Sequence, residues 1–251
     1  WMEWAGPDEI LLQRIDRLQH NDAVVLANAA TGAVGLVMNE HDSTWVDLQS
    51  DVPWLKDGHR FLWTSERDGW RHAYLISRSN GSAQLVTRGA FDVIGVAALD
   101  EARGWLYYFA SPTNATQTYL YRSRLNGRGA AERVTPADEA GTHRYTVSPN
   151  AKWAFHSWST YDSPGGTDLV GLPAHKVVRE LAPNTALIEK TRSWVKQPVQ
   201  PFKVALADGA TLDGWMIKPT NFDSAEKSSI LLYVYGETAG RTVLDGGMGS
   251  A

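Results

Sequence analysis

Few residues of this chain combine the types and the spacing that catalysis requires. The sequence contains no Cys, which excludes thiolate nucleophiles, thiolate metal ligands and disulfides. A nucleophilic serine of the hydrolase type needs a Gly-x-Ser-x-Gly turn between a strand and a helix, and no such pattern occurs. Ser250 follows Gly247-Met248-Gly249 but lacks the second glycine. We therefore expect no complete nucleophilic site within these residues.

The histidines give little further indication of a catalytic or metal site. Seven are present, with no His-Glu-x-x-His motif and no Cys partners, so we expect no metal site and no cofactor. His72, next to Arg71, is interpreted as a structural hydrogen-bonding residue and not as a base. The charged turn Glu66-Arg67-Asp68 is expected to be a solvated loop face.

Tyr235 is the one residue whose position suggests chemistry. It ends the continuous apolar run 230–235, which is typical of a strand inside a sheet that is covered on both faces. A phenol held at the end of such a strand can donate a hydrogen bond to a developing oxyanion. The residues alone favour the simpler reading, in which Tyr235 packs the end of a strand.

A repeated pattern of short apolar runs and turns precedes this region. Between Pro53 and Gly89, apolar runs at 61–63, 73–76 and 84–86 are separated by turns such as Asn80-Gly81. Asn-Gly turns tolerate positive φ, and short apolar runs between such turns predict antiparallel hairpins. This stretch therefore predicts one meandering sheet.

The same order occurs in three further copies. Their apolar runs lie at 10–12, 23–26 and 34–37, at 105–108, 118–121 and 131–134, and at 153–155, 167–170 and 176–178. Additional short strands are expected at 42–48, 93–96 and 145–147. The copies start about 45–50 residues apart, which is the spacing of four-stranded propeller blades.

The composition supports an all-β architecture and excludes some partners. The 251 residues are 43% hydrophobic and include 11 Trp and 9 Tyr, which pack well between sheet faces. A net charge of -4 without blocks of like charge excludes a phosphate-binding surface, so nucleic acid is not an expected partner. The longest apolar stretch, 23–38, is broken by a turn and is too short to span a bilayer.

The repeat ends near Leu181 and divides the chain into three parts. We expect a mainly β fold, with a partial β-propeller of about four blades at 1–183, a linker helix and hinge at 184–202, and the start of an α/β domain at 203–251. Asn184 is expected to cap the helix, and Pro198 and Pro201 to enforce an extended path after it. One hairpin is expected, with its turn at Asp208-Gly209.

The order of these elements, from the repeat through the helix and hairpin to the apolar run, resembles the dipeptidyl peptidase IV branch of the prolyl oligopeptidase serine peptidases. The matching segments are 61–72, 184–187, 208–219 and 233–236, so the resemblance runs in order through nearly the whole chain. In that family an eight-bladed propeller covers an α/β-hydrolase domain, and dipeptides are released from peptide amino termini after Pro or Ala. The resemblance implies that this chain is the second half of the propeller joined to the first strands of the hydrolase.

The resemblance also assigns roles. The position that matches Tyr235 stabilises the oxyanion of the tetrahedral intermediate in that family, whereas Tyr233 has no such role. The nucleophile, the acid and the His are expected after Ala251, and the Glu pair that binds the substrate amine before Trp1. No substrate-binding residue is therefore assigned within 1–251, and we expect the chain to be inactive alone.

Partners follow from the same resemblance. It implies peptide substrates, the missing half of the propeller and the hydrolase domain, a homodimer in the full protein, and a periplasmic or cell-envelope location. Two other readings are open: a non-catalytic propeller that binds proteins, and a peptidase homologue that has lost its nucleophile. The segment 211–236, which does not continue the repeat, favours the peptidase.

Overall fold

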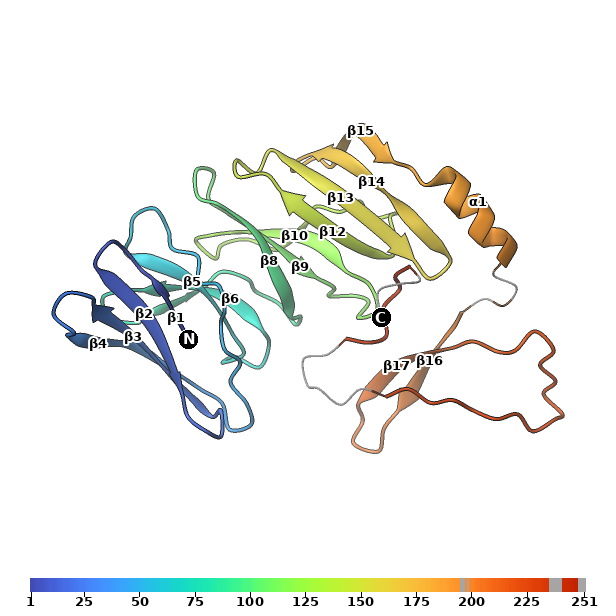
Figure 1. Cartoon of the computed structure of the whole chain (residues 1–251), viewed down its shortest axis with the longest axis horizontal. Coiled ribbons are helices and arrows are strands. Elements are labelled where there is room, and N and C mark those ends of the chain that lie inside the picture. The colour runs from blue at the N-terminus through green and yellow to red at the C-terminus, as the bar shows by residue number, and fades with distance from the viewer. Residues whose placement is uncertain (195–196, 198, 235–240, 248–251) are drawn as a thin grey trace. The chain divides into compact units, whose positions relative to one another are not determined.

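The chain is mainly β (Figure 1). The computed structural model describes residues 1–194, 197, 199–234 and 241–247. Within these residues there are strands β1 to β17 and one helix, α1. No helix of this described part is long and apolar enough to cross a membrane.

Four antiparallel sheets follow one another along the chain, as the repeat predicts. The first has the order β1-β2-β3-β4, the second β5-β6-β7, the third β11-β10-β9-β8 and the fourth β12-β13-β14-β15. Strand bounds in the first two are Met2–Trp4, Glu9–Ile15, Asn21–Asn28, Val34–His41, Arg60–Ser65, His72–Ser77 and Ala83–Leu85. Those in the other two are Val93–Asp100, Trp105–Ala110, Tyr119–Arg124, Glu132–Arg133, Thr142–Val147, Trp153–Thr160, Ser163–Gly171 and Lys176–Ala182. In each of the four sheets, strands that follow one another in the sequence lie side by side, which is the topology of a meander. The expected blade topology is therefore confirmed.

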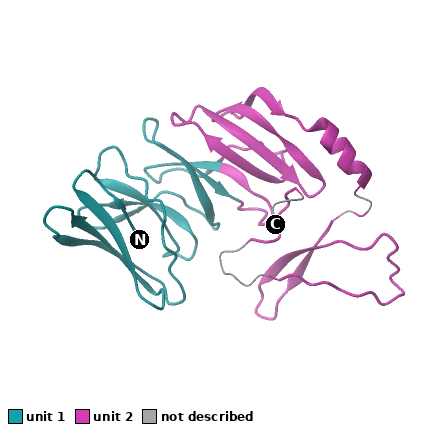
Figure 2. Ribbon diagram, viewed as in Figure 1, with its two compact units in different colours: residues 1–110, 121–132 teal, residues 111–120, 133–251 magenta. Residues whose placement is uncertain are grey.

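Contacts divide the chain into two compact units (Figure 2). The first contains residues 1–110 and 121–132, and the second contains residues 111–120 and 133–251. The first unit has an apolar core between its first two sheets, in which Leu11, Val24, Phe61 and Ile76 are fully buried. Alternating burial in β2 and β3 places one face of the first sheet on this core.

Turn glycines join successive sheets of the first unit. Gly81 and Gly127 follow Asn in their turns and have φ of 66° and 67°, a region that favours glycine. A Cβ at Gly81 would lie 2.1 Å from the carbonyl oxygen of Val37 in β4, and one at Gly127 would lie 2.1 Å from that of Leu85 in β7. The turn of one sheet therefore packs directly on the outer strand of the preceding sheet.

One predicted strand and one predicted cap are wrong. Residues 42–48 form no strand, because Asp42 bends the chain by accepting hydrogen bonds from the amides of Thr44 and Trp45. The second sheet accordingly has three strands, with an additional bridge between Trp54 and Phe61. Helix α1 (Thr185–Trp194) forms as expected, but the side chain of Asn184 donates to the carbonyl of Gly165.

Beyond the helix, the expected hairpin is present. Strand β16 (Gln200–Ala205) pairs with β17 (Thr211–Met216), and Gly209 in the connecting turn has φ of 90°. Pro201 pairs with Trp215, which agrees with the expected extended path. Pro198 lies outside the described residues.

Candidate functional site

Tyr235, the predicted oxyanion donor, lies outside the described residues. The run that leads to it, Ile230–Val234, is described and forms no strand. Its side chains are 74–98% exposed. The expected burial inside a sheet is therefore not seen in these five residues, because no strand in the described part of the chain pairs with them.

The chain after position 240 is anchored to the second unit by Arg241. Its guanidinium donates to Oγ1 of Thr118 at 3.1 Å and to the carbonyl oxygen of Gln117 at 2.8 Å, and it also reaches the carbonyl of Ala115. Burial lowers the pKa of Arg241 from its ordinary value. One cation thus satisfies three acceptors at the start of β10.

Asp245 completes this anchor. Its Oδ2 accepts a hydrogen bond from Nε2 of Gln117 at 2.7 Å, and its Oδ1 accepts one from the backbone N–H of Tyr161 at 2.8 Å. Its own N–H donates to the carbonyl of Thr116, and the N–H of Gly247 donates to Oγ of Ser159 at 2.8 Å. Residues 241–247, which follow Tyr235 closely in sequence, are therefore fixed to two turns of the second unit.

Tyr161 also contacts the hairpin. Its ring centroid lies 6.4 Å from that of Trp215 in β17, with an interplanar angle of 57°. Burial, followed by the nearby carboxylates of Asp245 and Asp213, raises the pKa of Tyr161 to about 12. This phenol stays protonated at neutral pH and cannot act as a base there.

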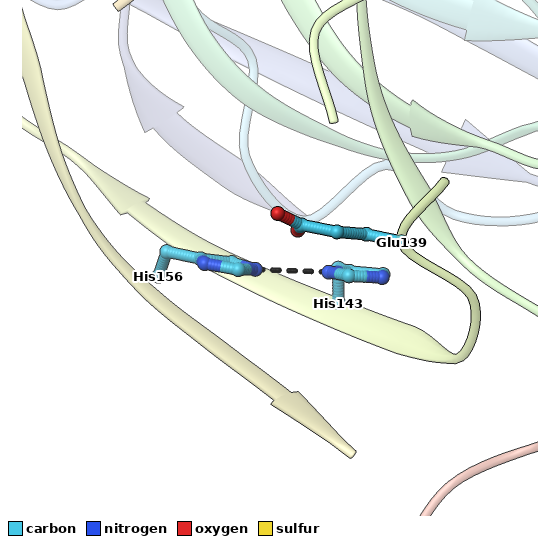
Figure 3. Close-up of side chains that lie close together, drawn as sticks. All are labelled: Glu139, His143 and His156. Carbon is cyan, nitrogen blue, oxygen red and sulfur yellow. Dashed lines mark hydrogen bonds between the residues drawn. The ribbon is translucent and has the colours of Figure 1, made fainter. Parts of the chain in front are cut away.

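A second constellation lies in the fourth sheet (Figure 3). His143 of β12 and His156 of β13 face each other with Nδ1 and Nε2 at 2.9 Å, and each ring is 1% exposed. The carboxyl group of Glu139 lies beside this pair, on the same side of both rings. One donor atom from each of these three residues lies within 4.8 Å of the other two.

Burial controls the protonation of this pair. It lowers the pKa of His143 to about 4 and that of His156 to about 3, and the neighbouring His175 lowers both further. The ring of Tyr145 stacks on that of His156 with centroids 4.6 Å apart, and its hydroxyl lies 2.8 Å from Nε2 of His175. Both facing imidazoles are therefore neutral at pH 7 and present lone pairs, not charge.

Sequence reasoning did not find this group. Because His143 and Tyr145 are two residues apart on β12, they share a face, and Tyr145 pairs with His156 across the sheet. The strand register that brings the histidines together is set by pairing and cannot be read from a metal-binding motif. By contrast, His72 is structural as predicted: its ring nitrogens contact Oγ1 of Thr87 and the carbonyl of Gly89, both at 3.0 Å.

Comparison with known proteins identifies the family. The family model described as the dipeptidyl peptidase IV N-terminal region matches residues 1–165, which include the first three sheets, all of β12 and β13, and the start of β14. The fold is a series of propeller-blade sheets, and the matching family model describes one propeller family. The chain belongs to the dipeptidyl peptidase IV N-terminal region family, as the sequence resemblance predicts.

Curated relatives extend the match through the rest of the chain. A protein described as "Probable dipeptidyl peptidase 4" from Emericella nidulans is 24% identical over 242 residues, covering 91% of this chain and 30% of its own length. The dipeptidyl peptidase 4 of Trichophyton equinum is 23% identical over 244 residues, covering 94% and 31%. The chain thus spans about a third of the relatives that it matches.

A solved structure shares the fold. The crystal structure of Porphyromonas gingivalis dipeptidyl peptidase 4 superposes with a TM-score of 0.83 at 22% identity, over 96% of this chain and 34% of that one. The blade sheets described above are therefore those of a β-propeller, which agrees with the predicted fold class.

Proposed function

We propose that this chain is part of a serine exopeptidase that releases N-terminal dipeptides, Xaa-Pro or Xaa-Ala, from peptides. The observation that carries the proposal is the ordered match: blade sheets in the matched region 1–165, then α1, the β16–β17 hairpin and the run that ends in Tyr235. A propeller scaffold without catalytic function would not need the last three elements. The relatives named as dipeptidyl peptidases support the same class.

In this proposal the blade sheets form a wall that limits access to the reaction centre. A peptide must then reach the site by its free end, which suits an enzyme that cuts near the amino terminus. The nucleophile, acid and His come from polypeptide outside residues 1–251, since no Gly-x-Ser-x-Gly turn occurs within them. The chain alone is therefore proposed to be inactive.

Tyr235 is proposed to stabilise the oxyanion. As the serine attacks the peptide carbonyl, negative charge develops on the carbonyl oxygen, and a phenol fixed nearby donates a hydrogen bond to it. The Arg241 and Asp245 contacts support this role, because they fix the chain shortly after Tyr235. The hydroxyl remains protonated unless a nearby base removes its proton, since an ordinary tyrosine has a pKa near 10.

The test is the kinetics of the full-length enzyme that contains this chain, with a chromogenic Gly-Pro anilide as substrate. Replacement Tyr235→Phe should lower kcat about 100–1000-fold and leave KM nearly unchanged, since the lost bond forms in the transition state. Tyr233→Phe is the matched control, and its kcat should equal that of the wild type.

Two results would contradict parts of this proposal. Full-length protein that does not hydrolyse the anilide would favour a binding propeller or an inactive homologue. Equal kcat values for Tyr235→Phe and Tyr233→Phe would remove Tyr235 from the site while leaving the exopeptidase assignment in place.

A further inference from the structure

The Glu139, His143 and His156 cluster has the composition of a transition-metal site. Two imidazoles and one carboxylate form a ligand set that binds zinc and related divalent cations. Of the described residues, these three form the only group of His, Cys, Asp or Glu side chains whose donor atoms converge in this way. They belong to the second unit and take no part in the anchor formed by Arg241 and Asp245.

The two facing nitrogens are the atoms that a cation would bind, and the far ring nitrogens lack hydrogen-bond partners. The contact between Nδ1 of His143 and Nε2 of His156 uses one proton and one lone pair, and Nδ1 of His156 has no hydrogen-bond partner. Leaving a buried polar atom unpaired costs about 1–3 kcal/mol. The polar groups of this buried pair are therefore incompletely satisfied, although aromatic rings pack against both imidazoles.

The surrounding charges also favour a cation. The carboxylates of Asp138 and Asp168 lie near that of Glu139, and the guanidinium of Arg133 opposes their negative charge. Three carboxyl groups thus share this region with one nearby guanidinium. A divalent cation would stabilise the ionised form of Glu139 at the position where it lies beside the two rings.

The two facing nitrogens need little movement to bind one ion. Two nitrogens bound tetrahedrally to zinc at about 2.0–2.1 Å lie about 3.3–3.4 Å apart. The facing nitrogens are 2.9 Å apart, so they would separate by a few tenths of an ångström. Both rings sit on adjacent strands with intact register, which keeps them aimed at the same point.

We propose that Glu139, His143 and His156 bind one first-row divalent cation of the zinc type, which ties the loop before β12 to strands β12 and β13. The ion has a structural role: it takes the place of the proton between the facing nitrogens, which moves to the far nitrogen of its own ring, and it neutralises the carboxylate.

The experiment uses the whole chain after treatment with a chelator and dialysis. Zinc chloride is titrated into the protein at pH 7.5 by isothermal titration calorimetry, and bound metal is counted by mass spectrometry after gel filtration. One equivalent should bind with a Kd at or below the micromolar range, and saturation should raise Tm. The replacements His156→Gln and Glu139→Gln should each weaken binding at least about 100-fold.

His41→Gln is the matched control, because this exposed imidazole contacts Oδ1 of Asn21 and lies in the other unit. It should bind zinc as the wild type does. Glu139→Gln removes a partly exposed side chain in a loop, so it tests the site even where His156→Gln fails to fold. Absence of binding to the wild-type chain, or equal binding by Glu139→Gln and the wild type, would overturn the proposal.

Discussion

Nε1 of Trp63 donates a hydrogen bond to Oε2 of Glu40 at 3.0 Å, joining β5 of the second sheet to β4 of the first. The same carboxylate accepts bonds from Oγ of Ser65 at 2.8 Å and Nη2 of Arg67 at 2.5 Å. The guanidinium of Arg67 also lies 5.0 Å from the ring centroid of Tyr74. One buried carboxylate therefore organises the polar contacts between two blades.

Replacement Glu40→Ala should destabilise the chain strongly. The side chain of Glu40 is 10% exposed, and its removal leaves the guanidinium and the indole N–H without their acceptor. Loss of one partner of a buried ion pair costs about 3–5 kcal/mol. Urea unfolding followed by tryptophan fluorescence measures this loss. Glu132→Ala, which removes a half-exposed carboxylate from Arg122, should cost about 1 kcal/mol or less.

Equal losses for these two variants would show that the Glu40 network does not stabilise the contact between the sheets.

Gly81→Ala should cost more than its backbone conformation alone explains. A left-handed conformation costs a non-glycine residue about 1–2 kcal/mol, and here the new methyl would also meet the carbonyl oxygen of Val37. We expect a total loss of about 3 kcal/mol or more in the free energy of unfolding. Gly32→Ala is the control, since Gly32 has φ of 69° but nothing within 4 Å of the added methyl.

The difference between the two alanine variants isolates the contact between sheets. If Gly32→Ala and Gly81→Ala lower the urea midpoint equally, the turn of the second sheet does not press on β4 as described.

Acid should destabilise the chain through the buried histidines. In the unfolded chain both imidazoles take up protons below pH 6.5, whereas in the folded chain they resist until about pH 4 and pH 3. Stability is therefore lost as the pH falls from about 6.5 towards 3–4, by up to ~1.4 kcal/mol per pH unit for each ring. Unfolding in urea at pH 7 and pH 5, with chelator present, measures this dependence.

Other groups near the pair modify this slope. His175 and Arg133 oppose protonation of the rings, whereas the raised pKa of Glu139 and Asp168 gives a smaller gain in stability on acidification. His156→Gln removes one of the two imidazoles, so its stability should fall less steeply between pH 7 and pH 5. An identical slope in this variant would contradict the lowered pKa values.

The isolated chain should associate. Every residue of β15 from Lys176 to Leu181 is exposed, including Val178 at 51%, and β15 is the edge strand of its sheet, whose outer side is a template for pairing. Light scattering should give a mass above the 27.7 kDa of one chain. Val178→Lys should reduce association, whereas Leu187→Lys, on exposed helix α1, should not. A monomeric wild-type chain would contradict this prediction.

The sequence predicted the blade sheets well because their signals are local. Asn80-Gly81 and Asn126-Gly127 specify turns with positive φ, and the apolar runs on either side can form only the strands that those turns connect. The order of the elements followed from the same pattern, whereas the family was indicated by the resemblance of particular segments, among them 61–72 and 208–219.

Contacts between distant residues were not predicted. Arg67 belongs to a turn expected to be solvated, as Glu66 and Asp68 are, yet its guanidinium reaches Glu40 in another sheet. The Glu139, His143 and His156 group depends on the register of β12 on β13. Burial of 230–234 was expected from composition alone, but a strand needs partners as well as apolar residues.

The glycine joints bear on how such chains lengthen during evolution. The second repeat encodes both a protruding tip, the Asn80-Gly81 turn, and a receiving carbonyl on its outer strand, that of Leu85, as Gly81 on Val37 and Gly127 on Leu85 show. A tandem duplication of one repeat would therefore copy both halves of the joint at once. A blade added in this way would already carry the turn and the carbonyl through which adjacent sheets contact each other.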